Sequence, residues 1–521
     1  MPSDMPPDLQ SAAAVTALPP TASLLVLGGD QRIAIQPGSQ VNKYGCQPFP
    51  AADRIAFGSS TASQISAQAF DAADRLRTRI AGALADAPAA TVYRAELMRL
   101  RGELLDICGL APPVTSEDAA PDVIFAASGT DAHLLASHLT AAQAQGSQRS
   151  LRVIMVNPEE SGSGVSTALS GRSFSAYNAL GDCGPHADAR HEVTHVAIRD
   201  PGGAPRSPQS VADDVAAQSD AALRGGSDVL LVLIDVSKTG CVAPEPVFAL
   251  QLQQRAAGRV HILVDACQFR IETATLRAYL AQGFMVAVTG SKFIGGPSFS
   301  AALLIPPALA ARMRPAGAPP QLERHSALEE WPAAWHAERT LSSSANPGLL
   351  LRWEAALHEL KAFKALPGAA VRKCLLRFNA AVQARLQSDP HFEALPAPAM
   401  PGRAAGLAPE WDDLASIHPF TLYRPQAHGS ESRQPLDTAQ VAHVYRQLQQ
   451  QRNGDGFIYS VGQPVVCGRR DGVEYSVLRL CIGAGMVVQA CGDPSGAAGD
   501  ALIAHAMACL DAIAGLISTT A

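Results

Sequence analysis

The alternation of short apolar runs with helical segments between Asp122 and Ile305 constrains the fold of this 521-residue chain most strongly. Runs such as DVLLVLIDV, VHILVD and FMVAV have the length and the β-branched content of buried strands. Segments such as PVFALQLQQRAAG and TATLRAYLAQG separate them and have helical spacing of apolar residues. Strands that alternate with helices predict a parallel sheet with right-handed crossovers. The sequence therefore predicts an α/β domain that binds its ligands outside the carboxyl ends of the strands.

Polar clusters follow these strands at the points where the strands end. The clusters are SGT (128–130), SKTG (237–240), DACQ (265–268) and TGSK (289–292). Because the carboxyl ends of parallel strands lie at one edge of a sheet, we expect the clusters to converge there.

The SGT cluster lies between the run VIFAAS and the helical segment DAHLLASHL. The free N–H groups and the dipole of a helix start favour a bound phosphate, and two hydroxyls add hydrogen bonds. The alternative is plain N-capping by serine or threonine. The cluster is neither a Walker motif nor a GxGxxG motif.

Lys292 lies on a glycine-rich turn between two apolar runs, FMVAV and SAALLI. A lysine is costly to bury without a task or a partner. Near an apolar core its pKa falls, and the neutral amine can form an imine. The alternative is an exposed lysine of a surface turn.

Taken together, these motifs resemble those of the fold-type I pyridoxal-phosphate-dependent enzymes. More narrowly, they resemble the class V aminotransferase group, which also includes cysteine desulfurases and kynureninase-like enzymes. The resemblance covers roughly Val123 to Ile305, and the C-terminal part more loosely. It implies pyridoxal 5′-phosphate as the cofactor, Lys292 as the internal-aldimine lysine and Asp265 as the partner of the pyridine nitrogen.

The resemblance also implies the other residues of the site. Gln268 is expected near the phenolic oxygen of the cofactor and Ser237 beside its ring. LRLCIGAG is similar to the segment that carries the substrate-carboxylate arginine, here Arg479. Arg172, in the glycine- and serine-rich loop 161–175, is a second candidate for substrate binding, although this loop could equally be a surface loop. Contacts with the cofactor phosphate are implied for Ser128, Gly129, Thr130, Thr289 and Ser291.

Two departures from the family pattern bear on the reaction. Where the family stacks a histidine or an aromatic residue on the cofactor ring, this chain has NPEESGSG, so another residue stacks or the reaction differs. No cysteine lies between Lys292 and Trp353, which argues against a cysteine desulfurase.

We expect an enzyme that acts on an amino acid or amine, foremost an aminotransferase. The alternatives are a lyase of the same fold, acting by elimination or by C–C or C–S cleavage, and a non-catalytic ligand-binding relative.

The pattern along the chain predicts four regions. They are a disordered N-terminus (1–20), an arm with two helices (21–115), the large cofactor-binding domain (116–346), and a linking helix with a small α+β domain (347–521). The stretch LLVLGGDQRI is expected to form a short strand and a turn, and MVVQAC a strand of the small domain. The turn-rich arm after Asn42 is interpreted as packing on the core rather than as a binding loop.

The composition excludes several classes of function. A net charge of −6 without a basic patch argues against a nucleic-acid partner. Ten scattered cysteines without a CxxC pair, and no signal peptide, indicate a cytoplasmic protein with reduced thiols. We expect no membrane span, because His505 and Asp511 interrupt the C-terminal apolar stretch. We expect no metal site at His186, His191 and His195, which lack a carboxylate helix motif. A homodimer is implied by the family resemblance.

Overall fold

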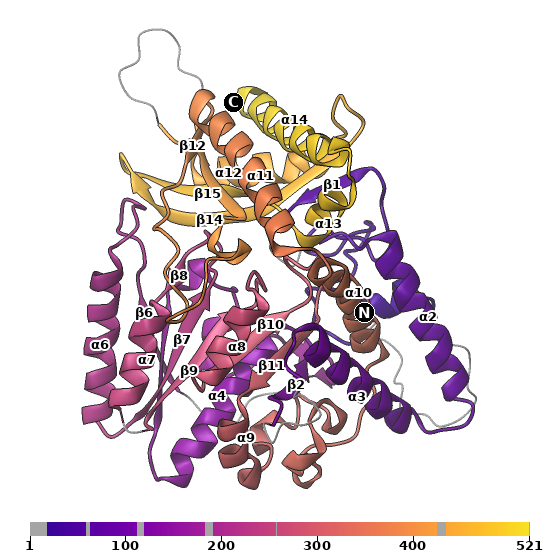
Figure 1. Ribbon diagram of the computed structural model, residues 1–521, viewed down its shortest axis with the longest axis vertical. Helices are drawn as coiled ribbons and strands as arrows, with labels where there is room; N and C mark the ends of the chain where they lie inside the picture. Colours follow the sequence, from indigo (N-terminus) through magenta and orange to yellow (C-terminus); the bar gives the residue numbers. More distant parts are fainter. Residues whose placement is uncertain are drawn as a thin grey trace, which may run out of the picture.

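The structure, a computed structural model, describes residues 18–58, 63–111, 119–182, 191–256, 258–424 and 434–519. Its central element is a large sheet in the lower half of Figure 1. The strand order is β2 (Asp122–Ala126), β11 (Ala301–Ile305), β10 (Met285–Thr289), β9 (Val260–Ala266), β7 (Asp228–Asp235), β3 (Leu151–Val156) and β6 (Glu192–Val196). The short β8 (Val242–Ala243) pairs with β7.

The large sheet is mostly parallel, as the sequence predicted. β10, β9, β7, β3 and β6 pair in parallel, whereas β11 runs antiparallel to both β10 and β2. The strands β2, β7, β9 and β10 therefore point in one direction, and their carboxyl ends share one edge.

Helices cover both faces of this sheet. Successive residues of β7 alternate between two cores, with Leu231 and Leu233 in one and Leu230 and Val232 in the other. The first core includes residues of α6 (Pro208–Arg224), α7 (Pro246–Arg255) and α8 (Thr273–Ala281). The second includes residues of α4 (Gly129–Gly146), α5 (Val165–Leu169) and α9 (Pro307–Met313). The strands read as continuous apolar runs because they are buried on both faces.

A smaller sheet lies in the upper part of Figure 1. Its order is β1 (Arg54–Phe57), β14 (Ile458–Arg470), β15 (Val473–Cys481), β13 (Ile417–Leu422) and β12 (Phe392–Ala394). Its helices are α11 (Gly368–Ser388), α12 (Thr438–Leu448), α13 (Ala484–Gly492) and α14 (Ala497–Thr519). Because β1 comes from the N-terminal arm, the arm and the C-terminal part form one sheet.

The remaining elements connect these two parts. The long helix α10 (Pro347–Lys364) packs against α2 (Ala67–Ala83) and α3 (Ala89–Ile107). Its first turn is capped by Asn346, whose side chain accepts a hydrogen bond from the amide of Leu349. The short elements are α1 (Thr21–Leu25), β4 (Tyr177–Asn178), β5 (Gly181–Asp182) and 3₁₀ turns at Pro158–Glu160, Arg314–Ala316, Pro320–Leu322, Leu328–Glu330, Ala333–Trp335, Ala337–Arg339 and Trp411–Asp413.

Two expected strands do not form. The stretch LLVLGGDQRI begins inside α1 and continues as turns, and MVVQAC lies in α13. A short apolar run is compatible with either a strand or a buried helical turn, so periodicity alone does not separate the two. The expected disorder of residues 1–20 falls mainly on residues 1–17, which lie outside the described residues.

The C-terminal apolar stretch forms one helix, as expected, but His505 and Asp511 do not make it too polar to qualify as a membrane span by length and composition. The imidazole of His505 is hydrogen bonded to the Tyr459 hydroxyl at 3.0 Å, and Asp511 forms an exposed ion pair with Arg385. By length and composition alone, Ala497–Ser518 is apolar enough to cross a membrane. Its large apolar side chains Leu510, Ile513 and Ile517 are buried against the small domain.

Candidate active site

The four predicted clusters converge on one cavity of about 140 Å³ at the carboxyl ends of β2, β7, β9 and β10. Eight of the eleven residues that the sequence predicts for the site line this cavity. The lining residues are Ser128, Gly129, Thr130, Asp265, Gln268, Thr289, Ser291 and Lys292. Ser237, Arg479 and Arg172 are not among the residues that line it.

The SGT turn both caps α4 and lines the cavity. Ser128 Oγ accepts from the amide of Asp131 at 3.3 Å, and the Ser128 amide donates to the Asp131 carboxylate at 2.9 Å. A side chain at Gly129 would place its Cβ 2.8 Å from Cys267 Sγ, so glycine is required for the close approach of α4 to β9. Capping and anion binding are therefore compatible here, because the helix start faces an open cavity.

Arg32 completes this cradle and has no counterpart in the sequence prediction. Its guanidinium donates to the hydroxyls of Ser128 and Thr130, both at 3.2 Å. The carboxylate of Asp30 orients it through bonds of 2.6 to 2.9 Å, and the ring of Phe299 lies 4.9 Å from it. The stretch GGDQRI carries no motif, so only the path of the arm through space reveals the role of Arg32.

Two further residues of the arm reach the site. Tyr44 lines the cavity, and the Ser63 hydroxyl donates to the carbonyls of Ser291 and Lys292 at 3.1 and 2.9 Å. The interpretation of the arm as a segment that only packs on the core was therefore wrong. Its β1 does pair with β14, but the loops around that strand also hold the lysine turn and the cavity wall.

Asp265 lies at the end of β9 as an ionised carboxylate. Its oxygens accept from Ser161 Oγ and the Cys267 amide, both at 3.2 Å, and His133 Nε2 lies 3.4 Å away. Burial raises the pKa of Asp265, but His133 and Lys292 outweigh burial and bring the pKa well below its usual value. The carboxylate is thus poised to hold a cationic group in the cavity.

Two polar atoms of the cavity lining are buried without a hydrogen-bond partner among the described residues. They are Gln268 Oε1 and His133 Nε2, although the latter lies near Asp265. The other nitrogen of His133, Nδ1, donates to the Gly129 carbonyl at 2.6 Å. Buried polar atoms are satisfied in the great majority of proteins, so these two are suited to contact a bound ligand.

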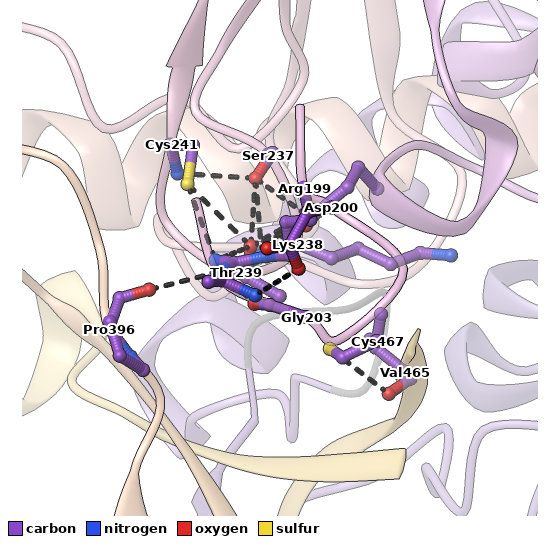
Figure 2. Close-up of polar contacts among 12 residues, drawn as sticks. Arg199, Asp200, Gly203, Ser237, Lys238, Thr239, Cys241, Pro396, Val465 and Cys467 are labelled. Atoms are coloured by element: carbon purple, nitrogen blue, oxygen red, sulfur yellow. Dashed lines mark hydrogen bonds and ion pairs between the residues drawn. The ribbon is translucent and has the colours of Figure 1, made fainter. Parts of the chain in front are cut away.

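A buried ion pair fixes the SKTG turn behind the cavity (Figure 2). Arg199 Nε donates to Glu160 at 3.1 Å, and the hydroxyls of Ser237 and Thr239 each donate to Glu160 at 2.7 Å. Ser237 is therefore bound to Glu160, and its predicted place beside a cofactor ring stays a prediction. The next residue, Lys238, lines the cavity instead. Figure 2 shows its side chain extending away from the ion-pair network.

The two predicted substrate-binding arginines lie outside the cavity lining. Arg479 is completely buried, and its guanidinium donates to the carbonyls of Gln463 at 2.9 and 3.2 Å and of Lys238 at 3.4 Å. Arg172 is exposed and donates to Ser170 Oγ at 3.0 Å. Gln463 itself lines the cavity, so Arg479 lies one layer behind the wall.

Outside the cavity, the cysteines and histidines that the structure describes form neither disulfides nor a metal centre. The nine cysteines of the described residues are free, and Cys183 lies outside them. Among the described residues, no group of three or more histidine, cysteine or acidic side chains is arranged to hold a metal ion. His186 also lies outside the described residues.

Comparison with known proteins identifies the fold. No family model matches the sequence, and no curated protein matches it. Mouse CSAD is 14% identical, with 88% of this chain and 83% of that chain covered and a TM-score of 0.52. Oryza sativa TDC, solved with PLP, is 14% identical, with 95% and 90% covered and a TM-score of 0.51. Rhodiola rosea 4-hydroxyphenylacetaldehyde synthase is 11% identical, with 92% and 85% covered and a TM-score of 0.51. The chain thus has the fold of the fold-type I pyridoxal-phosphate-dependent enzymes, but the comparison does not single out the class V aminotransferase group.

Proposed function

We propose that the protein is a pyridoxal 5′-phosphate-dependent enzyme that acts on an amino acid or an amine, with Lys292 as the residue that binds the cofactor covalently. The observation that carries this proposal is the composition of one cavity. The amine of Lys292, the ionised carboxylate of Asp265 and the helix start at Ser128 face the same space. An amine, an anion and an anion cradle are the three groups that a phosphorylated pyridine aldehyde requires.

The residues of the cavity suit the parts of this cofactor. The SGT turn and Arg32 would hold its phosphate, and Lys292 its aldehyde carbon. Asp265 would hold the pyridine nitrogen, and Gln268, whose Oε1 lacks a partner among the described residues, the polar edge of the ring. When bound, the cofactor supplies an electron sink that stabilises a carbanion at the substrate carbon. The ionised Asp265 favours the protonated ring nitrogen and so strengthens this sink.

The chain's own acid–base group in this scheme is Lys292. Its Nζ, when not bound to the cofactor, would accept or donate a proton at the substrate carbon. The bonds from Ser63 to the carbonyls of residues 291 and 292 fix the backbone that carries this amine. Half-buried on a short turn, the amine would keep its position while it exchanges the proton.

Transamination and lyase chemistry remain the two candidate reactions, because the same lysine and aspartate serve both. None of the three similar structures is named as an aminotransferase, and one is named for making 4-hydroxyphenylacetaldehyde. These names give the lyase more support than the aminotransferase, although the sequence motifs favoured the latter. A requirement for a keto-acid acceptor distinguishes transfer, since a lyase turns over without one.

We further propose a homodimer in the cytoplasm, with a large domain at 116–346 and a small domain formed by 347–521 and the N-terminal arm. The location rests on the reduced thiols and the dimer on the fold family. The division at residue 347 is supported by the order of the strands along the chain. All strands of the large sheet precede α10, which begins at residue 347, and four of the five strands of the small sheet, β12 to β15, follow it.

The decisive experiment is the visible absorption spectrum of the purified protein with added pyridoxal 5′-phosphate, before and after borohydride. We expect a yellow band that borohydride bleaches, with the reduced cofactor attached to Lys292 in the mapped peptides. Lys292→Ala should abolish the covalent adduct while Lys361→Met, an exposed lysine of α10, leaves it intact. A protein that gains no band, or that is labelled equally at Lys361, contradicts the proposal.

A further inference from the structure

We propose that Lys238, and not Arg479, binds the carboxylate of the substrate. This inference rests on the proposed function and assigns it a substrate class, an amine that carries a carboxylate. It also replaces the role that sequence resemblance gave to Arg479. The ammonium of Lys238 is available, the buried acidic groups near it are engaged, and Arg479 does not reach the cavity.

The ammonium of Lys238 faces the cavity without a hydrogen bond or an ion pair to any described residue. Its backbone is held in place, because its amide donates to the Glu160 carbonyl at 2.9 Å and its carbonyl accepts from Arg479 at 3.4 Å. The amide of Ser237 also donates to the Cys241 carbonyl at 2.8 Å, which closes the turn. A fixed backbone with a free cationic tip is suited to bind an anion.

The buried acidic side chains near Lys238 are already engaged, whereas Glu159 is exposed to solvent. Glu160 accepts hydrogen bonds from Arg199, Ser237 and Thr239. Asp265 accepts from Ser161 and from the amide of residue 267. Lys238 is half-buried and has no ion pair to a buried carboxylate of the described residues, so this end of the cavity favours a ligand that brings its own negative charge.

Arg479 does not reach the cavity, although it contributes charge behind it. Its side chain has no exposed surface, and its donors are used by the carbonyls of Gln463 and Lys238. Because Gln463 and Lys238 both line the cavity, Arg479 is a positioning residue that holds two segments of the wall.

The charges around Lys238 make this binding depend on pH. Burial, together with Arg479 and Lys292, lowers the pKa of Lys238 to about 8, while Glu159 and Glu160 oppose the shift. The ammonium binds a carboxylate and the neutral amine does not, so affinity should fall as pH rises through about 8. An arginine at this position keeps its charge throughout this range.

The test compares amino acids with the amines that lack only their carboxylate. The holoprotein is titrated with L-alanine, L-leucine, L-phenylalanine and L-glutamate, and with the decarboxylated amine of each, by the change in the cofactor band. In Lys238→Met we expect half-saturation by the amino acids to rise about 10- to 100-fold, the usual effect of losing a charged hydrogen bond. The amines should change less than about 2-fold, and Lys238→Arg should retain amino-acid binding at pH 9, where the wild type loses it.

Three controls separate this inference from the proposed function. Lys361→Met, on the exposed face of α10, should titrate like the wild type. The cofactor band and the borohydride adduct at Lys292 should survive in Lys238→Met, which shows that the variant is folded and loaded. Equal losses for amino acids and amines, or no loss for either, would overturn the role of Lys238 while the band still stands. A wild type without a band would instead overturn the proposed function.

Discussion

Arg32 is the residue through which the N-terminal arm contacts the proposed phosphate cradle at residues 128–130. It bridges Ser128 and Thr130, and its own charge is balanced by Asp30. We predict that Arg32→Met weakens pyridoxal 5′-phosphate binding about 10- to 100-fold, because a charged donor to the phosphate is lost. Equilibrium dialysis at constant pH measures this affinity.

The control for Arg32 is the cofactor without its phosphate. Pyridoxal should bind Arg32→Met and wild type alike, because the change acts on the phosphate alone. Arg75→Met, an exposed residue of α2, should leave both affinities unchanged. If pyridoxal binding falls as far as pyridoxal 5′-phosphate binding, Arg32 shapes the whole cavity rather than its phosphate end.

At the scale of single residues, the sequence predicted which residues lie near the cavity better than it predicted which way their side chains point. Lys292, Asp265 and the SGT turn reach the cavity because strand ends fix where they lie. Within SKTG, however, successive side chains point apart, and the buried Glu160 determines that Ser237 turns away from the cavity and Lys238 towards it. No local pattern encodes Glu160 as that partner, because the contact joins residues 77 positions apart.

Helix α4 and strand β9 approach each other at a contact that only glycine allows. A Cβ at Gly129 would lie 2.8 Å from Cys267 Sγ and 3.2 Å from the methyl group of Thr289. We predict that Gly129→Ala displaces the helix start and weakens cofactor binding about 10-fold or more, since misplaced donors lose their hydrogen bonds. Dialysis against pyridoxal 5′-phosphate measures the loss.

A second substitution tests whether this contact is the cause. Cys267→Ala removes the sulfur but leaves a Cβ that the added methyl group would meet at 3.6 Å, an ordinary contact distance. The double variant Gly129→Ala/Cys267→Ala should therefore recover most of the lost affinity. If it does not recover, the remaining contact of 3.2 Å with the Thr289 methyl group is enough to displace the helix start.

The large sheet could be predicted from the sequence, whereas the small domain could be predicted only in part. Continuous apolar runs between helices specify a parallel sheet directly, and seven residues of β9 are all buried. In the small domain the run MVVQAC forms α13, because its packing partners and not its composition decide between strand and helix. The pairing of β1 with β14 joins residues about 400 positions apart, which no local signal predicts.

The two parts of the molecule are joined by a buried ion pair from the segment between β12 and β13. Arg403 donates to both oxygens of Asp235, at the end of β7, at 2.7 and 3.0 Å. The hydroxyl of Tyr279 adds a third bond to this carboxylate at 2.7 Å. Both charged residues are almost completely buried, and Asp235 depends on Arg403 for its charge balance. Arg403 itself also lies 3.3 Å from Asp413 and 3.9 Å from Asp412.

We predict that Arg403→Met lowers the free energy of unfolding by about 3–5 kcal/mol, because it leaves Asp235 buried without its counter-ion. Arg377→Met, which breaks the exposed pair with Asp500, should cost about 1 kcal/mol or less. Urea unfolding followed by tryptophan fluorescence compares the two variants. The double variant Arg403→Met/Asp235→Asn removes both charges and should regain much of the loss, since the penalty lies in the orphaned carboxylate. If it stays as unstable as Arg403→Met, Arg403 stabilises the molecule through its other contacts, which are its packing, its bond to the Asp412 carbonyl and its ion pairs with Asp412 and Asp413.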